Sequence, residues 1–283
     1  MIATILCKDG SAAFMMNDVL KNRPELTLET IRRMEDMSWF THARIFDDLL
    51  VVAQRETACY IWKTSAGLVI FDGIWPHRAV YEAILRAIRE AGWNPEEIRK
   101  FIITHGHTDH TGCGKWLVQN HGAATYLSRT DDRFWREHPV KPDRPETWKD
   151  FDITCYLEDG DTVDCGDKSV TVLGTPGHTP GCLSYLFPVQ ENGERHLAAL
   201  FGGATPPWND PEGTRLHRES IDRFVSAAAK AGADVALSNH TAFDNGLERI
   251  ACSRNRLACL PNPYILGREG FVRFCRVYYA AAE

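Results

Sequence analysis

The chain has 283 residues, of which 44% are hydrophobic and 25% charged, an ordinary composition for a globular protein with a sizeable core. Its net charge of −6 gives no basic face for a nucleic-acid backbone, and no run of about 18 apolar residues predicts a membrane span. We therefore expect a small-molecule substrate, and neither a nucleic acid nor a membrane as a partner.

The N-terminal residues and the cysteines indicate the cellular compartment of the protein. The first residues, "MIATILCKDGSAAFMMNDVLK", lack the basic and long apolar regions of a secretory signal. The nine cysteines are scattered, odd in number and form no CxxC pair, which is typical of free thiols in a reducing compartment. We expect a cytoplasmic protein with most thiols free.

The first half of the chain predicts helices, then strands. Residues 17–40 indicate short helices, so we assign residues 1–45 to an N-terminal helical extension and 46–283 to the main domain. Three β-rich runs, at 49–54, 58–62 and 67–73, predict a meander. A helix over 77–93 and a short buried strand over 100–104 follow.

The second half repeats the alternation. A helix over 114–120 and a strand over 124–128 precede a polar, tryptophan-bearing stretch at 130–152. The later elements are strands at 161–165, 169–174, 182–187 and 196–203, a helix at 218–231, a strand at 234–239, and helical segments beyond Asp244. Two groups of strands, each with its own helices, predict a layered α/β sandwich and argue against one doubly wound sheet.

The stretch "THGHTDHTG" carries the chemistry. His105, His107, Asp109 and His110 follow a strand end, where side chains on a loop can converge. At this spacing His105 and His107 can point to one side while Asp109 and His110 point elsewhere, so one loop can serve two metal ions. Imidazole and carboxylate ligands suit zinc. The alternative, a solvated polar turn, is disfavoured for four ligand-type residues at this spacing.

Two later histidines stand in the same context. His178 in "LGTPGHTPGC" and His240 in "ALSNHTAFDN" each follow a predicted strand and open a loop of small residues. The other six histidines lack that context, and we expect structural or surface roles for them: His42, His77, His121, His138, His196 and His217.

These motifs, "THGHTDHTG", "GTPGHTPG" and "SNH" in this order, resemble the metallo-β-lactamase superfamily from about Leu49 to the C-terminus. The resemblance implies a four-layer αβ/βα sandwich over residues 46–283, with a metal site at the edge between two sheets. Asp72 matches a strand-terminal aspartate that buttresses the metal-binding loop in the family. A plain turn residue is an equally weighted alternative for Asp72.

One departure narrows the resemblance. Many family members carry an aspartate that bridges both metals, but "LFGGATPPW" places Ala204 there, and alanine cannot bind a metal. Members without this bridge and without a cysteine ligand form the subclass B3 β-lactamases. His107 in place of a glutamate disfavours the flavo-di-iron branch, and the missing bridge weakens a persulfide dioxygenase assignment. By resemblance two zinc ions are implied, one held by His105, His107 and His178 and the other by Asp109, His110 and His240.

The expected activity is hydrolysis. Two zinc ions can share a hydroxide with a pKa near 7 and polarise a carbonyl, while Asp109 orients the hydroxide as a catalytic residue. The bond cleaved would be a cyclic amide, a lactone or an ester, as in a subclass B3-like β-lactamase. The alternatives are a cytoplasmic lactonase or thioesterase, or a redox or binding relative of the fold. Cys113, close to the motif, is expected to be an inert thiol.

The substrate pocket is the least determined feature. Its walls are candidates only: Trp135, Trp148, Trp208 and Asn209, with packing the favoured role for each tryptophan. The N-terminal 40 residues either cover the pocket or form a contact in a homo-oligomer, and the sequence leaves both open.

Overall fold

A computed structural model describes residues 36–137, 149–207, 210–257 and 259–282. The N-terminal helices predicted before residue 36 lie outside this range, as do Trp148, Trp208 and Asn209. The helical extension over residues 1–45 therefore stays a prediction for its first 35 residues. Residues 41–45, however, belong to a strand of the main sheet.

The larger sheet has seven strands in chain order, from β1 to β7. Its strands are β1 (Thr41–Phe46), β2 (Leu49–Ala53), β3 (Ala58–Thr64), β4 (Gly67–Phe71), β5 (Ile98–Ile102), β6 (Ala124–Leu127) and β7 (Cys155–Tyr156). β1 to β4 pair antiparallel, which confirms the predicted meander, and β4 to β7 pair parallel.

The smaller sheet has five strands in the order β12-β11-β10-β9-β8. They are β8 (Thr162–Asp164), β9 (Ser169–Gly174), β10 (Leu183–Glu191), β11 (Glu194–Phe201) and β12 (Val235–Ser238). Only β11 and β12 pair parallel, because the long helix α7 connects them.

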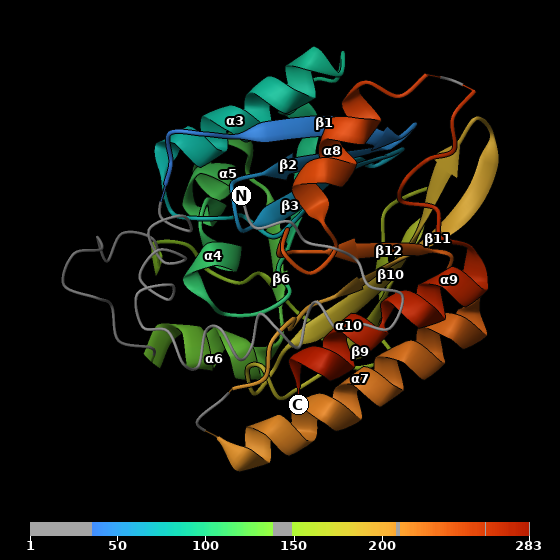
Figure 1. Ribbon diagram of the computed structural model, residues 1–283. Helices are drawn as coiled ribbons and strands as arrows, with labels where there is room; N and C mark the ends of the chain where they lie inside the picture. The colour runs from blue at the N-terminus through green and yellow to red at the C-terminus, as the bar shows by residue number, and fades with distance from the viewer. Residues whose placement is uncertain (1–35, 138–148, 208–209, 258, 283) are drawn as a thin grey trace.

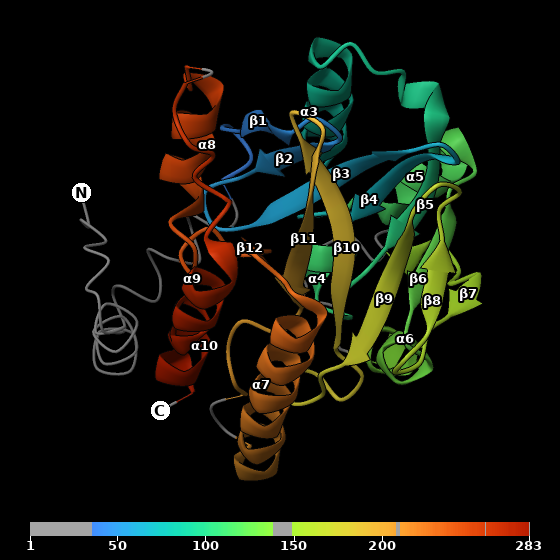
Figure 2. The same cartoon turned by 90° about the vertical axis from the view of Figure 1, so that its right-hand side faces the viewer.

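Helices cover the outer face of each sheet (Figures 1 and 2). The helices are α3 (Arg78–Glu90), α4 (Thr108–Thr111), α5 (Gly114–His121), α6 (Arg129–Glu137), α7 (Pro211–Ala231), α8 (Gly246–Arg254), α9 (Gly267–Phe274) and α10 (Arg276–Ala281), with a 3-10 turn at Pro95–Glu97. α3 and α5 pack on the larger sheet, while α7, α9 and α10 pack on the smaller one. The predicted four-layer αβ/βα sandwich is confirmed.

The core between the sheets is aromatic. The rings of Phe71 and Phe187 stack with centroids 4.5 Å apart, and Trp62 lies 5.2 Å from Phe187. All three side chains are buried, so each removes a large apolar area from water and holds the sheets face to face. This packing fixes the common edge at which the strand-end loops meet.

Three elements differ from the sequence prediction. β1 was assigned to the extension, although it alternates in burial and pairs with β2. α6 occupies part of the polar stretch at 130–152, where no helix was predicted, and its polar residues surround a single buried face. α7 begins at Pro211, well before residue 218, since Asp210 caps it by accepting from the Glu212 N–H and Pro211 suits the first helical position.

No helix within the described ranges is both long and apolar enough to span a bilayer.

Candidate metal centre

Loops from both sheets meet at one edge of the sandwich. His105 and His107 follow β5 of the larger sheet, His178 follows β9 of the smaller sheet, and His240 follows β12. Asp109 and His110 lie on α4, the single helical turn that continues the first loop. The six candidate residues therefore come together from three strand ends, and they form two groups.

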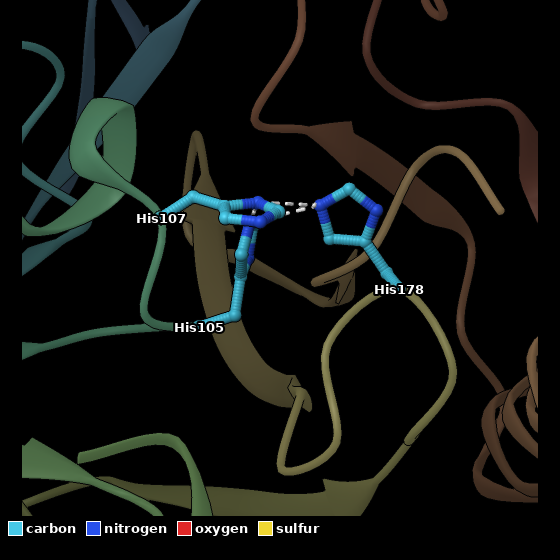
Figure 3. Close-up of side chains that lie close together, drawn as sticks. All are labelled: His105, His107 and His178. Carbon is cyan, nitrogen blue, oxygen red and sulfur yellow. Dashed lines mark hydrogen bonds between the residues drawn. The ribbon is translucent and has the colours of Figure 1, made fainter. Parts of the chain in front are cut away.

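The first group is a triangle of imidazole nitrogens (Figure 3). His105 Nε2 lies 3.1 Å from His107 Nδ1 and 3.1 Å from His178 Nε2. His107 Nδ1 lies 3.0 Å from His178 Nε2. In Figure 3 the rings of His105 and His107 rise from one loop and the ring of His178 reaches them from the facing loop.

The second group joins one carboxylate to two imidazoles. Asp109 Oδ2 lies 3.5 Å from His110 Nε2 and 3.8 Å from His240 Nε2. The two Nε2 atoms are 3.3 Å apart. The two groups are neighbours, because the ring centroids of His105 and His110 are only 4.0 Å apart.

Both groups have the size of a zinc site. A tetrahedral zinc with bonds of about 2.0–2.1 Å places its ligand atoms about 3.3 Å from one another. The observed spacings of 3.0–3.1 Å in the first group and 3.3–3.8 Å in the second lie close to that value. Each group supplies three ligand atoms and so leaves a fourth position for water or substrate.

The hydrogen bonds on the far side of the rings fix which nitrogen carries the proton. His178 Nδ1 donates to the Thr205 carbonyl at 2.6 Å, and His240 Nδ1 donates to the Glu56 carbonyl at 3.3 Å. A neutral imidazole has one N–H, so the Nε2 lone pair of each ring points into the centre. Ligating histidines in metal sites show this same arrangement.

Asp72 fixes the first loop in the same way. Its carboxylate accepts from the Thr104 N–H at 2.8 Å and from the Thr104 hydroxyl at 2.9 Å. It also accepts from His110 Nδ1 at 2.8 Å and from Asn239 Nδ2 at 3.1 Å. Because the Thr104 hydroxyl donates to Asp72, it accepts from His105 Nδ1 at 2.9 Å. Asp72 thus supports the loop and directs two rings, more than a plain turn residue would do.

The ligand atoms of both groups therefore fit a cation. The lone pairs of His110 Nε2 and His240 Nε2 face each other at 3.3 Å, and those of His105 Nε2 and His178 Nε2 face each other at 3.1 Å. Facing lone pairs repel unless a proton or a metal ion lies between them. Imidazole nitrogens with one carboxylate are ligands that zinc prefers.

Burial sets the charge of the ligands. It lowers the pKa of His105 and His178 well below the usual range, and the neighbouring imidazoles lower both further. Burial also lowers the pKa of His240, to about 4. For Asp109 burial acts in the opposite sense, but the charges of His110 and His240 outweigh it and lower the pKa to about 2. These residues are in the unprotonated form that a metal requires.

His110 behaves differently. Burial alone would lower its pKa, but the carboxylates of Asp109 and Asp72 outweigh burial and raise it. Of these four histidine ligands, His110 therefore holds a proton most readily. A metal ion that binds its Nε2 would have to displace that proton.

The remaining histidines have partners elsewhere. His42 pairs with Glu90, His77 caps α3 and His121 contacts the Tyr81 hydroxyl. His196 pairs with Asp234, and the buried His217 donates to the Gly203 carbonyl. His138 lies outside the described residues. Within the described chain, the two groups of possible ligands contain only the six residues predicted from the motifs.

Two further expectations concern packing. Trp135 is fully buried and its ring lies 4.8 Å from that of Phe151, so it is a core residue and not a wall of the pocket. Cys113 is fully buried, and burial raises the pKa of its thiol. A buried, protonated thiol is a poor nucleophile, as expected for an inert cysteine.

Comparison with known proteins agrees with this geometry. Residues 53–191 match the model of the metallo-beta-lactamase superfamily. This segment is similar to the domains of that superfamily. It contains the first loop, α4 and His178 of the candidate centre, while His240 lies beyond it.

Curated relatives of the superfamily match over part of their length. The hydroxyacylglutathione hydrolase of Hahella chejuensis is 38% identical over 105 residues, which cover 37% of this chain and 33% of the relative. Hydroxyacylglutathione hydrolase GloC of Haemophilus influenzae is 25% identical, over 48% of this chain and 63% of the relative. The matches span between about a third and just under two thirds of these two relatives.

Solved structures of the superfamily share the fold over most of the chain. The subclass B3 metallo-beta-lactamase BJP-1 of Bradyrhizobium japonicum superposes with a TM-score of 0.69 at 22% identity, covering 84% of this chain and 90% of that one. The native FEZ-1 enzyme of Legionella gormanii gives 0.67 at 18% identity, with 83% and 91% covered. At these identities the similarity establishes the fold alone.

Proposed function

We propose that this protein is a zinc-dependent hydrolase with two metal ions. His105, His107 and His178 would hold one ion, and Asp109, His110 and His240 the other. The observation that carries the proposal is the set of imidazole lone pairs that face one another at the centre, held there by hydrogen bonds on the outer side of each ring. Zinc bound there would lower the pKa of water towards about 7 and polarise a carbonyl group.

Asp109 has a second role in this proposal. Its carboxylate is ionised at neutral pH because His110 and His240 offset the effect of burial. One carboxylate oxygen lies towards both imidazoles, and the side chain remains 12% exposed, so the group can contact a substrate. An ionised carboxylate at this position can accept a hydrogen bond from the attacking water and orient it.

We propose a cyclic amide, a lactone or an ester as the bond that is cleaved. Ala204 is buried and replaces a bridging carboxylate, which favours the ligand set of the subclass B3 β-lactamases and hence a β-lactam. The fold similarity to BJP-1 and FEZ-1 is consistent with that substrate. The relatives named hydroxyacylglutathione hydrolases favour the alternative, a thioesterase or lactonase.

The test combines metal analysis with a substrate screen. Purified protein should bind about two zinc ions and hydrolyse at least one member of a panel of β-lactams, lactones, thioesters and phosphoesters. Removal of the metal with a chelator should abolish turnover, and added zinc should restore it. His196→Ala is a matched control, because this histidine pairs with Asp234 outside the centre and its loss should leave zinc content unchanged.

Two results would contradict the proposal. Protein that binds no zinc after loading would refute the metal assignment. Protein that binds two zinc ions but cleaves nothing in the panel would instead favour a redox or binding relative of the fold.

We also propose that the protein works in the cytoplasm with reduced thiols. The eight cysteines of the described residues are free, and five of them are buried with a raised thiol pKa. Cell fractionation and thiol titration of the native protein test this. Recovery from an extracytoplasmic fraction, or several native disulfides, would overturn it.

A further inference from the structure

A buried aspartate outside the candidate centre contacts both loops of the three-histidine group. Asp131 lies in the first turn of α6 and is fully buried. Its Oδ2 accepts from the Gly106 N–H at 2.7 Å and from the Thr179 hydroxyl at 2.7 Å, and its Oδ1 accepts from the Gly181 N–H at 2.6 Å. These are short, charge-assisted bonds of the strong kind.

The partners of Asp131 flank the ligands. Gly106 lies between His105 and His107, and Thr179 directly follows His178. One carboxylate therefore joins two loops that are distant in sequence. Gly106 lies 25 positions before Asp131, and Thr179 lies 48 positions after it. The distance between these loops sets the distance between His178 and the His105–His107 pair.

Close packing reinforces this joint. A Cβ atom on Gly106 would lie 2.8 Å from the Asp131 carbonyl oxygen, and one on Gly181 would lie 2.7 Å from the Asp131 nitrogen. Ser128 adds a further link, since its hydroxyl accepts from the Asp131 N–H at 3.0 Å and donates to the Gly181 carbonyl at 2.7 Å. Only glycine lets both loops come this near to the start of α6.

We propose that Asp131 is a positioning residue that fixes the separation of the His105–His107 turn and the His178 loop, and so tunes the zinc affinity of the three-histidine site. The inference rests on the proposed function. The other group depends on a different carboxylate, since His110 Nδ1 donates to Asp72. Loss of Asp131 should therefore weaken one zinc ion and spare the other.

Asp131→Asn tests this with little change in shape. An amide presents one acceptor and one NH₂ group where the carboxylate has two acceptors. At least one of the three donors then faces an N–H, and a buried donor without a partner moves or drives its loop away. The Gly106 and Gly181 N–H groups cannot reorient, whereas the Thr179 hydroxyl can.

The experiment uses two backgrounds that each keep one site. His240→Ala leaves the three-histidine group as the complete site, and His178→Ala leaves the group of Asp109, His110 and His240. Zinc affinity is measured in each background by competition with a chromophoric chelator, with and without Asp131→Asn. We expect a loss of roughly tenfold or more in the first background, the size typical of lost outer-shell support, and a change below about twofold in the second.

A matched control separates positioning from general stability. Asp48 is also a buried aspartate, and it has two partners, the Gln190 N–H at 3.0 Å and the Lys168 ammonium at 2.7 Å. It lies in the turn between β1 and β2, which contains none of the candidate ligands. Asp48→Asn should lower the melting temperature and leave both zinc affinities unchanged. Equal losses in both backgrounds, or no loss in either, would overturn the proposal.

A second variant covers a failure of Asp131→Asn to fold. Thr179→Val removes one of the three donors and preserves the side-chain shape, so it should weaken the three-histidine site by roughly threefold through the same partners. An unchanged affinity in that variant would refute the role of Asp131. If the wild-type chain binds no zinc at all, the proposed function itself fails, a result distinct from two well-bound zinc ions in Asp131→Asn.

Discussion

Asp72→Asn should move the ring proton of His110 from Nδ1 to Nε2 and so remove that histidine from the second metal site. In the native chain His110 Nδ1 donates to Asp72 Oδ2 at 2.8 Å, which leaves Nε2 free to bind a metal. An asparagine amide in the same place would donate to Nδ1, and the ring proton would move to Nε2. The backbone tolerates the change, because the φ of 60° at Asp72 is one that asparagine adopts readily.

The expected magnitude follows from the contacts. The Thr104 N–H keeps its acceptor at Oδ1, and Asn239 Nδ2 keeps the Gly202 carbonyl at 2.9 Å. The bond to His110 is kept with its direction reversed, so the main loss is the bond that Asp72 Oδ2 accepts from the Thr104 hydroxyl at 2.9 Å. One lost bond to a charged group should cost about 1–3 kcal/mol of unfolding free energy in the metal-free protein. For a chain of this size that corresponds to a fall of roughly 2–10 °C in melting temperature. Zinc affinity at the second site should fall about 10- to 100-fold.

The assay pairs calorimetry with imidazole ¹⁵N spectroscopy, which reports the proton position on each ring, and with zinc competition. Asp234→Asn is a matched control, since Asp234 accepts from His196 Nδ1 at 2.6 Å and from the Leu197 N–H at 3.0 Å in the same pattern away from the centre. It should reduce stability and leave zinc binding unchanged. An Asp72→Asn protein whose His110 retains the native tautomer, with both zinc affinities unaltered, would refute the reasoning.

Three further outcomes are expected. Asp109→Asn should lower turnover of a responsive substrate at least about 100-fold with an unchanged circular dichroism spectrum, and wild-type turnover would show that the carboxylate has no role in orienting water. His240→Ala should bind about one zinc ion after loading and desalting, where the wild type binds about two, because only one of the groups loses a ligand. Two firmly bound ions in the variant would exclude His240 from the centre. In the folded protein iodoacetamide should modify the exposed Cys252 and Cys259 first, since burial raises the thiol pKa of the enclosed cysteines, and early labelling of Cys113 by mass spectrometry would contradict that.

The sequence predicted what depends on local pattern. The strand runs and the motif spacing placed His105, His107, His178 and His240 at strand ends, and the structure brings them to one edge. Asp131 was not found, because its function depends on Gly181, 50 residues away, and nothing in the spacing of the polar stretch marks it. β1 was missed for a similar reason, since its pairing with β2 and its cover by α8 are tertiary contacts that a short alternating run does not reveal.

The outer hydrogen bonds of the ligand rings also determine where the centre tolerates mutation. His178 and His240 are oriented by the main-chain carbonyls of Thr205 and Glu56, so substitutions of those two side chains leave the acceptors in place. His105 and His110 depend instead on side chains, and both lead to Asp72. Random mutagenesis should therefore find positions 205 and 56 permissive and position 72 intolerant. Outside the ligands themselves, position 72 thus joins position 131 as a point where a single substitution would damage the site.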